Sequence, residues 1–129
     1  MPIEYSVREG GRFVHAIARG EVTNEEFIDY ETKRGGDARV KASCRELLEV
    51  PAGVLRLVTR EAIEEALSRR AAKAARAPHR CAIVVSYSDS AAWDLAKLFE
   101  KLAAARSPGS VVVFGDVGTA KTWLGASEP

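Results

Sequence analysis

One segment near the end of the sequence has the residue types of a phosphate-binding loop. Gly115–Thr122 matches the glycine-rich pattern G-x4-G-K-[ST], except that Ala120 replaces the second glycine. The β-carbon of Ala120 would stand where the backbone must wrap a phosphate. Only seven residues follow Thr122, too few for a later strand that carries a magnesium-binding acid. We therefore interpret the segment as a strand, a turn and a short helix, and keep nucleotide binding as the weaker alternative.

A second set of polar residues precedes a predicted helix that runs to about Arg106. Ser88, Asp89 and Ser90 stand at its start, and serine and aspartate are preferred helix N-caps. Free amide groups at a helix start can also hold an anion, and α/β proteins bind ligands beyond the carboxyl ends of their strands. These three residues are therefore capping residues and, alternatively, polar anchors for a ligand or partner.

Trp93 lies one turn into the same predicted helix, away from its apolar face. That face carries the apolar positions of the helix, namely Ala92, Leu95, Ala96, Leu98, Phe99, Leu102 and Ala103. Trp93 shares a side with Lys97 and Glu100, which indicates a contact surface for a partner. The alternative is that its ring folds over a neighbouring loop, such as residues 54–57.

The segment before the second predicted helix supplies further candidates. Residues 54–58 are short and apolar, and Leu55 and Leu57 are candidates for contact with an apolar ligand. Thr59 begins a helix that runs to about Arg76 and is either an N-cap or a site of phosphorylation.

The histidines and cysteines have structural explanations. His15 alternates with Phe13 and Ile17, which predicts a hydrogen-bonded core or interface histidine. Cys44 and Cys81 lie in apolar runs without a cysteine or histidine at ligand spacing, which predicts reduced core thiols. We expect no catalytic residue, no metal site and no cofactor.

The charged residues do not point to nucleic acid. Glu61, Glu64 and Glu65 are expected to form the solvated first turn of a helix. One basic cluster is present, consisting of Arg69, Arg70, Lys73, Arg76, His79 and Arg80. It lacks interleaved aromatic residues. Its position at the end of a helix is explained by the favourable interaction of basic side chains with the helix dipole. The net charge is +1, so we expect no nucleic-acid partner.

The elements that position these residues alternate along the chain. Ile3–Arg8 and Arg12–Arg19, separated by two glycines, predict a β-hairpin. A capping box at Thr23–Glu26 begins a helix that Gly35-Gly36 ends. The remaining predictions are strands at Cys44–Val50, Arg80–Tyr87 and Val111–Phe114, and helices at Thr59–Arg76, Ser88–Arg106 and Gly118–Leu124. This order predicts an α/β fold with one mixed sheet, an N-terminal antiparallel hairpin followed by mostly parallel strands, and about four helices.

The length of 129 residues suits one domain, which we place at residues 1–125, followed by a polar C-terminal tail at 126–129. The start of the chain lacks the basic and apolar regions of a signal peptide. The longest aliphatic stretches are too short to span a membrane. The expected compartment is the cytoplasm.

Three parts of the sequence resemble the SpoIIAA-like, or STAS-like, family. They are Phe13–Thr23, then Arg80–Val85 with the later Ala96–Phe99, and finally Val113–Asp116 with Ala120, Trp123 and Leu124. The resemblance implies this α/β fold and a non-catalytic regulatory or partner-binding role. Some members are switched by phosphorylation of a serine at a helix start, and Thr59 is the nearest equivalent here. The fold also resembles lipid-carrier domains, which implies a nonpolar ligand as an alternative.

We therefore expect a bacterial, non-enzymatic binding module. It would contact a protein partner, or a small apolar or anionic ligand, through helix N-termini and the Trp93 region. The alternative is a cytosolic carrier of a lipid-like molecule, which predicts a cavity lined by Leu55, Leu57 and Trp93. The edge strand near the hairpin could pair with a second copy to give a homodimer.

Overall fold

The computed structural model describes residues 2–41, 44–72, 80–106 and 109–125. The order of the elements is the predicted one. The strands are β1 (Ile3–Arg8), β2 (Phe13–Ala18), β3 (Arg45–Val50), β4 (Arg80–Val85) and β5 (Val111–Phe114). The helices are α1 (Asn24–Gly36), α2 (Arg60–Ala72), α3 (Ser90–Ala104) and α4 (Val117–Leu124). The predicted end of the second helix and the predicted C-terminal tail lie outside the described residues.

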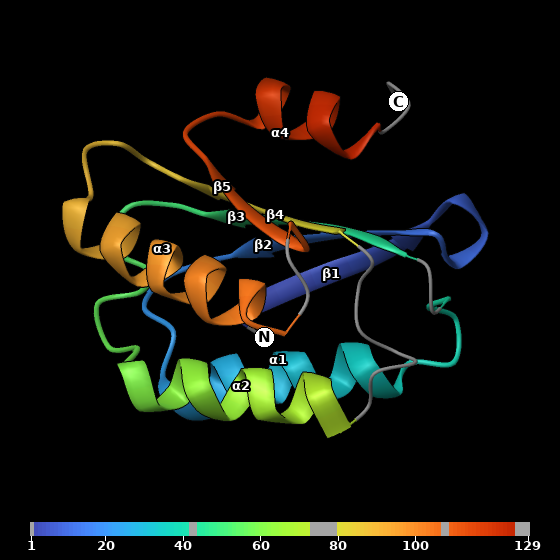
Figure 1. Ribbon diagram of the computed structural model, residues 1–129, viewed down its shortest axis with the longest axis horizontal. Helices are drawn as coiled ribbons and strands as arrows, with labels where there is room; N and C mark the ends of the chain where they lie inside the picture. Colours follow the sequence, from blue (N-terminus) through green and yellow to red (C-terminus); the bar gives the residue numbers. More distant parts are fainter. Residues whose placement is uncertain (1, 42–43, 73–79, 107–108, 126–129) are drawn as a thin grey trace.

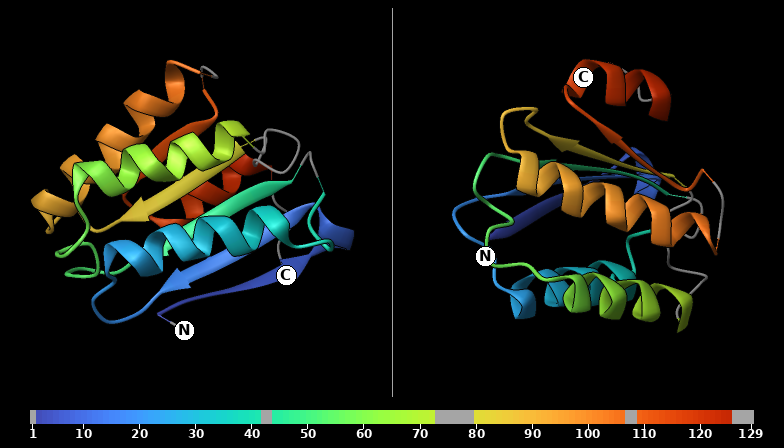
Figure 2. Two further views of the ribbon diagram at one scale, coloured as in Figure 1. Left: turned by 90° about the horizontal axis from the view of Figure 1, so that it is seen from below. Right: turned by 60° about the vertical axis from the view of Figure 1, so that its left-hand side comes forward.

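The five strands form one sheet in the order β1-β2-β3-β4-β5. β1 and β2 pair antiparallel, and every later neighbour pairs parallel. Connections between parallel strands almost always have the same handedness. The helices that connect β2 to β3, β3 to β4 and β4 to β5 therefore lie on the same side of the sheet. Helices α1, α2 and α3 cover one face and α4 covers the other (Figure 1). Seen from below, α1, α2 and α3 lie side by side (Figure 2). The predicted fold class is confirmed.

Apolar cores lie on both sides of the sheet. The larger one joins the inner faces of α1, α2 and α3 to the strands. The smaller one packs Ala120 and Leu124 of α4 on Phe13, Leu47 and Ala82. β4 is consequently covered on both faces, which explains its continuous apolar run.

Two local sequence signals form as predicted. The β1–β2 connection is one tight turn, in which a β-carbon on Gly11 would collide with the backbone oxygen of Arg39. Thr23 and Glu26 form the capping box of α1: the Thr23 side chain accepts a hydrogen bond from the Glu26 amide, and the Glu26 carboxylate accepts one from the Thr23 amide. Both signals are local, so the sequence alone was sufficient to place them.

Three charged side chains are buried between α1 and β3. Glu31 and Arg34 of α1 are 4% and 1% exposed, and Glu46 of β3 is 0% exposed. On α1 they continue the buried stripe of Phe27 and Tyr30 at spacings of three and four residues. The sequence analysis did not single out these charged positions.

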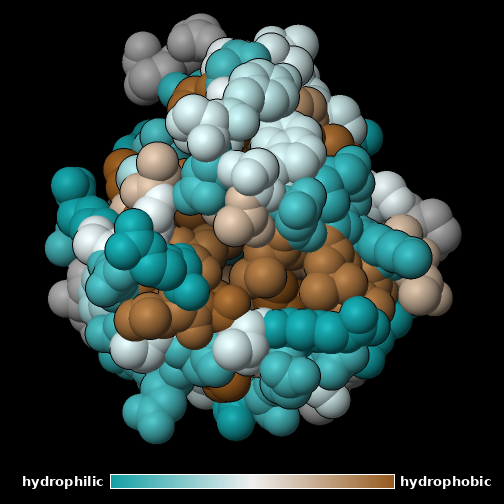
Figure 3. Space-filling view, turned by 90° about the vertical axis from the view of Figure 1, so that its left-hand side faces the viewer, coloured by the Kyte–Doolittle hydropathy of each residue, from teal (hydrophilic) through white to brown (hydrophobic). Residues whose placement is uncertain are grey.

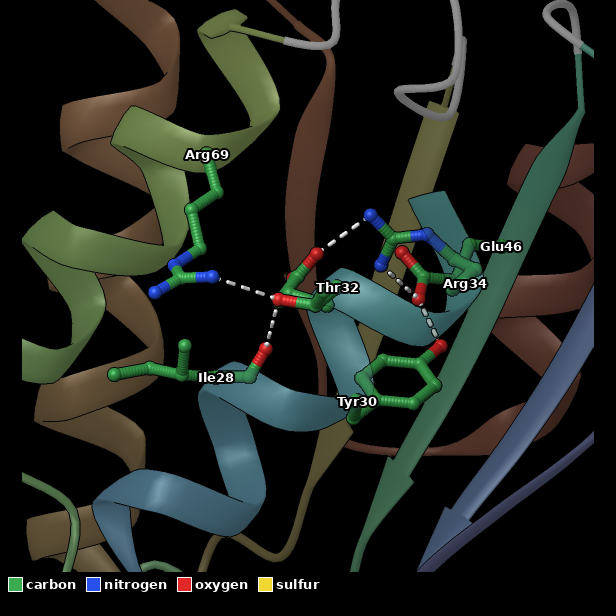
Figure 4. Close-up of polar contacts among 7 residues, drawn as sticks. Ile28, Tyr30, Thr32, Arg34, Glu46 and Arg69 are labelled. Atoms are coloured by element: carbon green, nitrogen blue, oxygen red, sulfur yellow. Dashed lines mark hydrogen bonds and ion pairs between the residues drawn. The ribbon is translucent and has the colours of Figure 1, made fainter. Parts of the chain in front are cut away.

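The Arg34 guanidinium contacts both carboxylates, and its contact with Glu46 is drawn in Figure 4. Its Nη1 donates to Oε2 of Glu46 at 3.0 Å, and its Nη2 lies 2.5 Å from Oε2 of Glu31. The Tyr30 hydroxyl donates to the same oxygen of Glu46. Burial, with the Glu46 charge, raises the pKa of Tyr30 well above its usual value. Burial alone would lower the pKa of Arg34, but the Glu31 and Glu46 charges raise it well above its usual value. Tyr30 thus stays a donor and Arg34 stays charged.

Replacing Arg34 tests how much this network stabilises the fold. Arg34→Met keeps a long side chain but removes the guanidinium that contacts two buried carboxylates, and it should lower the free energy of unfolding by about 3–5 kcal/mol. Urea unfolding measures the change. Arg69→Met, which breaks the exposed pair with Glu65, is the control and should cost less than about 1 kcal/mol. Equal effects of the two substitutions would contradict the assignment.

Candidate functional site

The carboxyl ends of β3, β4 and β5 lie together at one edge of the sheet, because the three strands are parallel neighbours. The loops that leave them comprise residues 51–59, 86–89 and 115–116. A pocket of about 410 Å³ opens between these strand ends and the start of α4. It is lined by Glu49, Val50, Pro51, Val84, Ser86, Tyr87, Ser88, Gly115, Asp116 and Val117. This is the position at which open α/β sheets bind ligands.

An exposed aromatic ring stands at the wall of this pocket. Tyr87 is 74% exposed, yet its ring centroid lies 5.0 Å from that of Trp93, with 33° between the ring planes. On another side the ring lies so close to Gly115 that a β-carbon there would overlap it. Tyr87 is therefore held in place while most of its surface faces solvent.

Trp93 is partly buried and packs at the border of the larger core. Its ring partner, Tyr87, belongs to the loop between β4 and α3. The sequence predicted that the strand would include Tyr87, but β4 ends at Val85. This boundary error hid the second aromatic of the pair, because Tyr87 continued an apolar run and was counted as its last strand residue.

Asp89 is the N-cap of α3 and also joins two loops. Its Oδ1 accepts from the Ala92 amide at 3.1 Å, and its Oδ2 accepts from the Gly53 amide at 2.8 Å. The Gly53 bond, followed by the Ala92 bond, lowers the pKa of Asp89. Ser88 Oγ lies 2.7 Å from Ser86 Oγ, and Ser90 is the first residue of α3. The capping prediction is confirmed for Asp89.

An apolar groove lies on the other side of the strand ends, between α1, α2, α3 and the sheet. Its lining is Phe27, Leu48, Val50, Leu55, Val58, Ile63, Ile83, Leu95, Ala96 and Phe99. Viewed toward the strand ends, the molecule shows hydrophobic side chains gathered in a hollow with hydrophilic ones around it (Figure 3). The groove holds a cavity of about 20 Å³, enough for one water molecule. Of the predicted lining, Leu55 is present, whereas Leu57 and Trp93 are not among these residues.

Leu57 and Thr59 occupy the loop beside the groove. Leu57 is 47% exposed. Thr59 bonds to Asn24 at the start of α1: its amide donates to Asn24 Oδ1 at 2.9 Å, and its hydroxyl accepts from Nδ2 at 3.1 Å. The hydroxyl also accepts from the Ala62 amide at 3.4 Å, as an N-cap does. Thr59 therefore connects the starts of α1 and α2, and its phosphorylation stays a prediction.

The Gly115–Thr122 segment does not form a phosphate cradle. α4 begins at Val117, so the residues that would wrap a phosphate are helical instead. Asp116 caps this helix by accepting from the amide and the hydroxyl of Thr119, at 2.8 and 2.9 Å. The same two bonds lower the pKa of Asp116. The interpretation as strand, turn and helix is confirmed.

His15 pairs with Glu49 of the neighbouring strand. Its Nε2 lies 2.5 Å from Oε2 of Glu49, and the two side chains are 14% and 28% exposed. The prediction of a hydrogen-bonded histidine is confirmed. The sequence did not indicate Glu49 as the partner, because β2 and β3 become neighbours only in the sheet. Glu49 also lines the pocket.

The remaining candidates have structural roles where they are described. Cys44 and Cys81 are buried and form no disulfide. Arg69 pairs with Glu65, and Arg80 donates to the Trp123 carbonyl at 2.8 Å. The rest of the basic cluster, which is the Arg70 side chain, Lys73, Arg76 and His79, falls outside the description. Within residues 2–41, 44–72, 80–106 and 109–125, no group of three or more His, Cys, Asp or Glu side chains could hold a metal ion. None of the helices in the same ranges has the length and apolarity to cross a membrane.

Neither a protein-family model nor a curated protein matches the chain. A solved structure matches it with a TM-score of 0.59: an uncharacterised DUF3478-family protein from Shewanella loihica PV-4, described as having a SpoIIAA-like fold. The match covers 95% of this chain and 93% of that one. This chain has a SpoIIAA-like fold. The two sequences are 17% identical, so the comparison establishes the fold of this chain alone. Its function has to be inferred from the geometry of the site.

Acid titration tests the loop connection through Asp89 in this SpoIIAA-like structure. A carboxylate whose pKa is lowered on folding stabilises above its unfolded pKa of about 4, and this contribution is lost as the pH falls through the folded pKa. Wild type should therefore exceed Asp89→Asn in unfolding free energy at neutral pH, and the difference should shrink below about pH 4. Urea unfolding across this range measures it. Asp94→Asn, on the exposed side of α3, is the control, and a pH-independent difference for Asp89→Asn would contradict the assignment.

Proposed function

We propose that this protein is a non-catalytic binding module that takes its partner at the carboxyl ends of β3, β4 and β5. Tyr87 is the observation that carries this proposal. A ring that is 74% exposed usually moves freely, but Trp93 and the Gly115 backbone hold this one. Rigid aromatic side chains lose little entropy on binding and are enriched among the residues that dominate binding energy.

The surroundings of Tyr87 support the same proposal. The adjoining pocket of about 410 Å³ falls within the size range of small-ligand sites. The Asp89 bonds to Gly53 and Ala92 fix the neighbouring loops, so the surface is largely formed before binding. The Ala92 bond occupies one of the amides at the start of α3, where the sequence suggested an anionic ligand, and the Asp89 carboxylate places a negative charge there. These surroundings favour a partner that uses the ring and the pocket.

Three further parts of the proposal concern regulation, assembly and compartment. Phosphorylation of Thr59 would add charge beside the Asn24 bonds that connect α1 to α2, and so offers a regulatory route. β1 is an edge strand at which a second copy could pair. The two buried thiols without a disulfide accord with a reducing compartment such as the cytoplasm.

The carrier of a nonpolar molecule is a second candidate, favoured by the entirely apolar lining of the groove. Its cavity of about 20 Å³ is far below the roughly 300 Å³ at which ligand pockets begin, so cargo would have to part α2 from α3. In native mass spectrometry of protein purified from its own host, a carrier shows added mass that denaturation removes. A binding module shows 14.0 kDa or a multiple, which is the result we expect.

Capture from a lysate of the source organism tests the binding module, using the immobilised protein and two matched variants. Tyr87→Ala removes the exposed ring of the proposed surface, and Leu57→Ala removes the exposed side chain beside the groove. A bound protein should be retained by wild type and by Leu57→Ala, and reduced at least about five-fold by Tyr87→Ala. Retention by Tyr87→Ala together with loss by Leu57→Ala would place the interaction at the groove and overturn the proposal.

A further inference from the structure

We propose that the pocket beside Tyr87 binds an ammonium or guanidinium group, presented as a lysine or arginine side chain of the partner protein. This inference rests on the proposed function, because it names the chemistry that the same surface recognises. It depends on the charge of the pocket, on the exposed ring, and on the way in which the neighbouring helix starts are capped.

The pocket carries acidic and no basic side chains among the described residues that line it. Glu49 is 28% exposed and is held in place by His15. Asp116 is fixed by the Thr119 amide and hydroxyl, which keep it ionised at neutral pH. A cation that enters the pocket therefore meets two carboxylates and displaces no bound arginine or lysine of the lining.

Tyr87 adds the feature that distinguishes an organic cation from a metal ion. An aromatic face attracts an ammonium or guanidinium group that approaches within about 6 Å of its centre. The Ser86 and Ser88 hydroxyls, which also line the pocket, can accept hydrogen bonds from such a group. Metal ions need several converging ligand atoms instead, and the described residues form no such group.

Each of the helix starts nearest to the pocket is capped by a carboxylate. The Asp89 carboxylate accepts from the Ala92 amide at the start of α3, and the Asp116 carboxylate accepts from the Thr119 amide at the start of α4. Each helix start thus carries its own negative charge, and an added anion would be repelled by both. The pocket therefore discriminates by charge in favour of cations.

NMR titration of the ¹⁵N-labelled protein tests the charge preference with three probes. Nα-acetyl-arginine methylamide presents the side chain as a peptide does. Its citrulline counterpart has the same shape but a neutral urea, and methylguanidinium presents the cation without a peptide. The arginine probe should shift the amide signals of Tyr87 and Gly115, bind more tightly than methylguanidinium, and bind more tightly than the citrulline probe by about three-fold or more.

Matched variants tie this binding to the named groups. Tyr87→Phe keeps the aromatic face and should keep the affinity, whereas Tyr87→Ala and Glu49→Gln should each weaken it by about three-fold or more. Gly115→Ala places a methyl group where the ring lies, so it should weaken binding while the fold is retained. Glu64→Gln, an exposed acid on α2, is the control and should leave affinity unchanged.

Three results overturn the inference while the proposed function stands. The first two are equal binding of the citrulline and arginine probes, and binding of methylguanidinium as tight as that of the arginine probe. Absence of any shift at Tyr87 and Gly115 also overturns it. The capture experiment with Tyr87→Ala decides the proposed function separately, because it requires no particular charge on the partner.

Discussion

The position of α1 depends on one buried guanidinium. Arg34 reaches from the helix to Glu46 of β3 and holds Glu31 of its own helix on the way. Packing then extends outward from α1: Phe27 meets Phe99 of α3 edge to face, with ring centroids 6.3 Å apart. A charge cluster of this kind discriminates strongly among alternative positions of the helix on the sheet, because burying a carboxylate away from a cation is costly. The helical layer is thus aligned by the placement of charge as well as by apolar contact.

The strands of the sheet, together with the loops that follow them, also position the candidate site. β3, β4 and β5 lie in parallel register, so their carboxyl ends are level and their loops emerge together. Asp89 then joins the loop after β3 to the start of α3. The pocket consequently has walls from three segments far apart in sequence, and none of these segments could form it alone. The geometry of the pocket therefore depends on how the strands pair in the sheet.

The sequence predicted the features that depend on near neighbours. The capping box at Thr23, the hairpin glycines and the alternation of strands and helices are local patterns, and all of them form. The buried network was missed because Glu31, Arg34 and Glu46 are residue types usually found at the surface, and only the docking of α1 on β3 pairs them. Tyr87 was missed for a different reason: it extends an apolar run beyond the last strand residue, so its type did not reveal where the strand ended.

Gly115 has a consequence for how this surface can change over evolution. The Tyr87 ring and a side chain at position 115 compete for the same space, so the two positions are not independent. A lineage that keeps the aromatic ring must keep glycine, whereas one that loses the ring is free to accept alanine. Since the obstructed atoms belong to an exposed side chain and not to the backbone, the exchange need not disturb the sheet. One methyl group at position 115 is therefore enough to move the ring from its place, while the backbone of the sheet stays as it is.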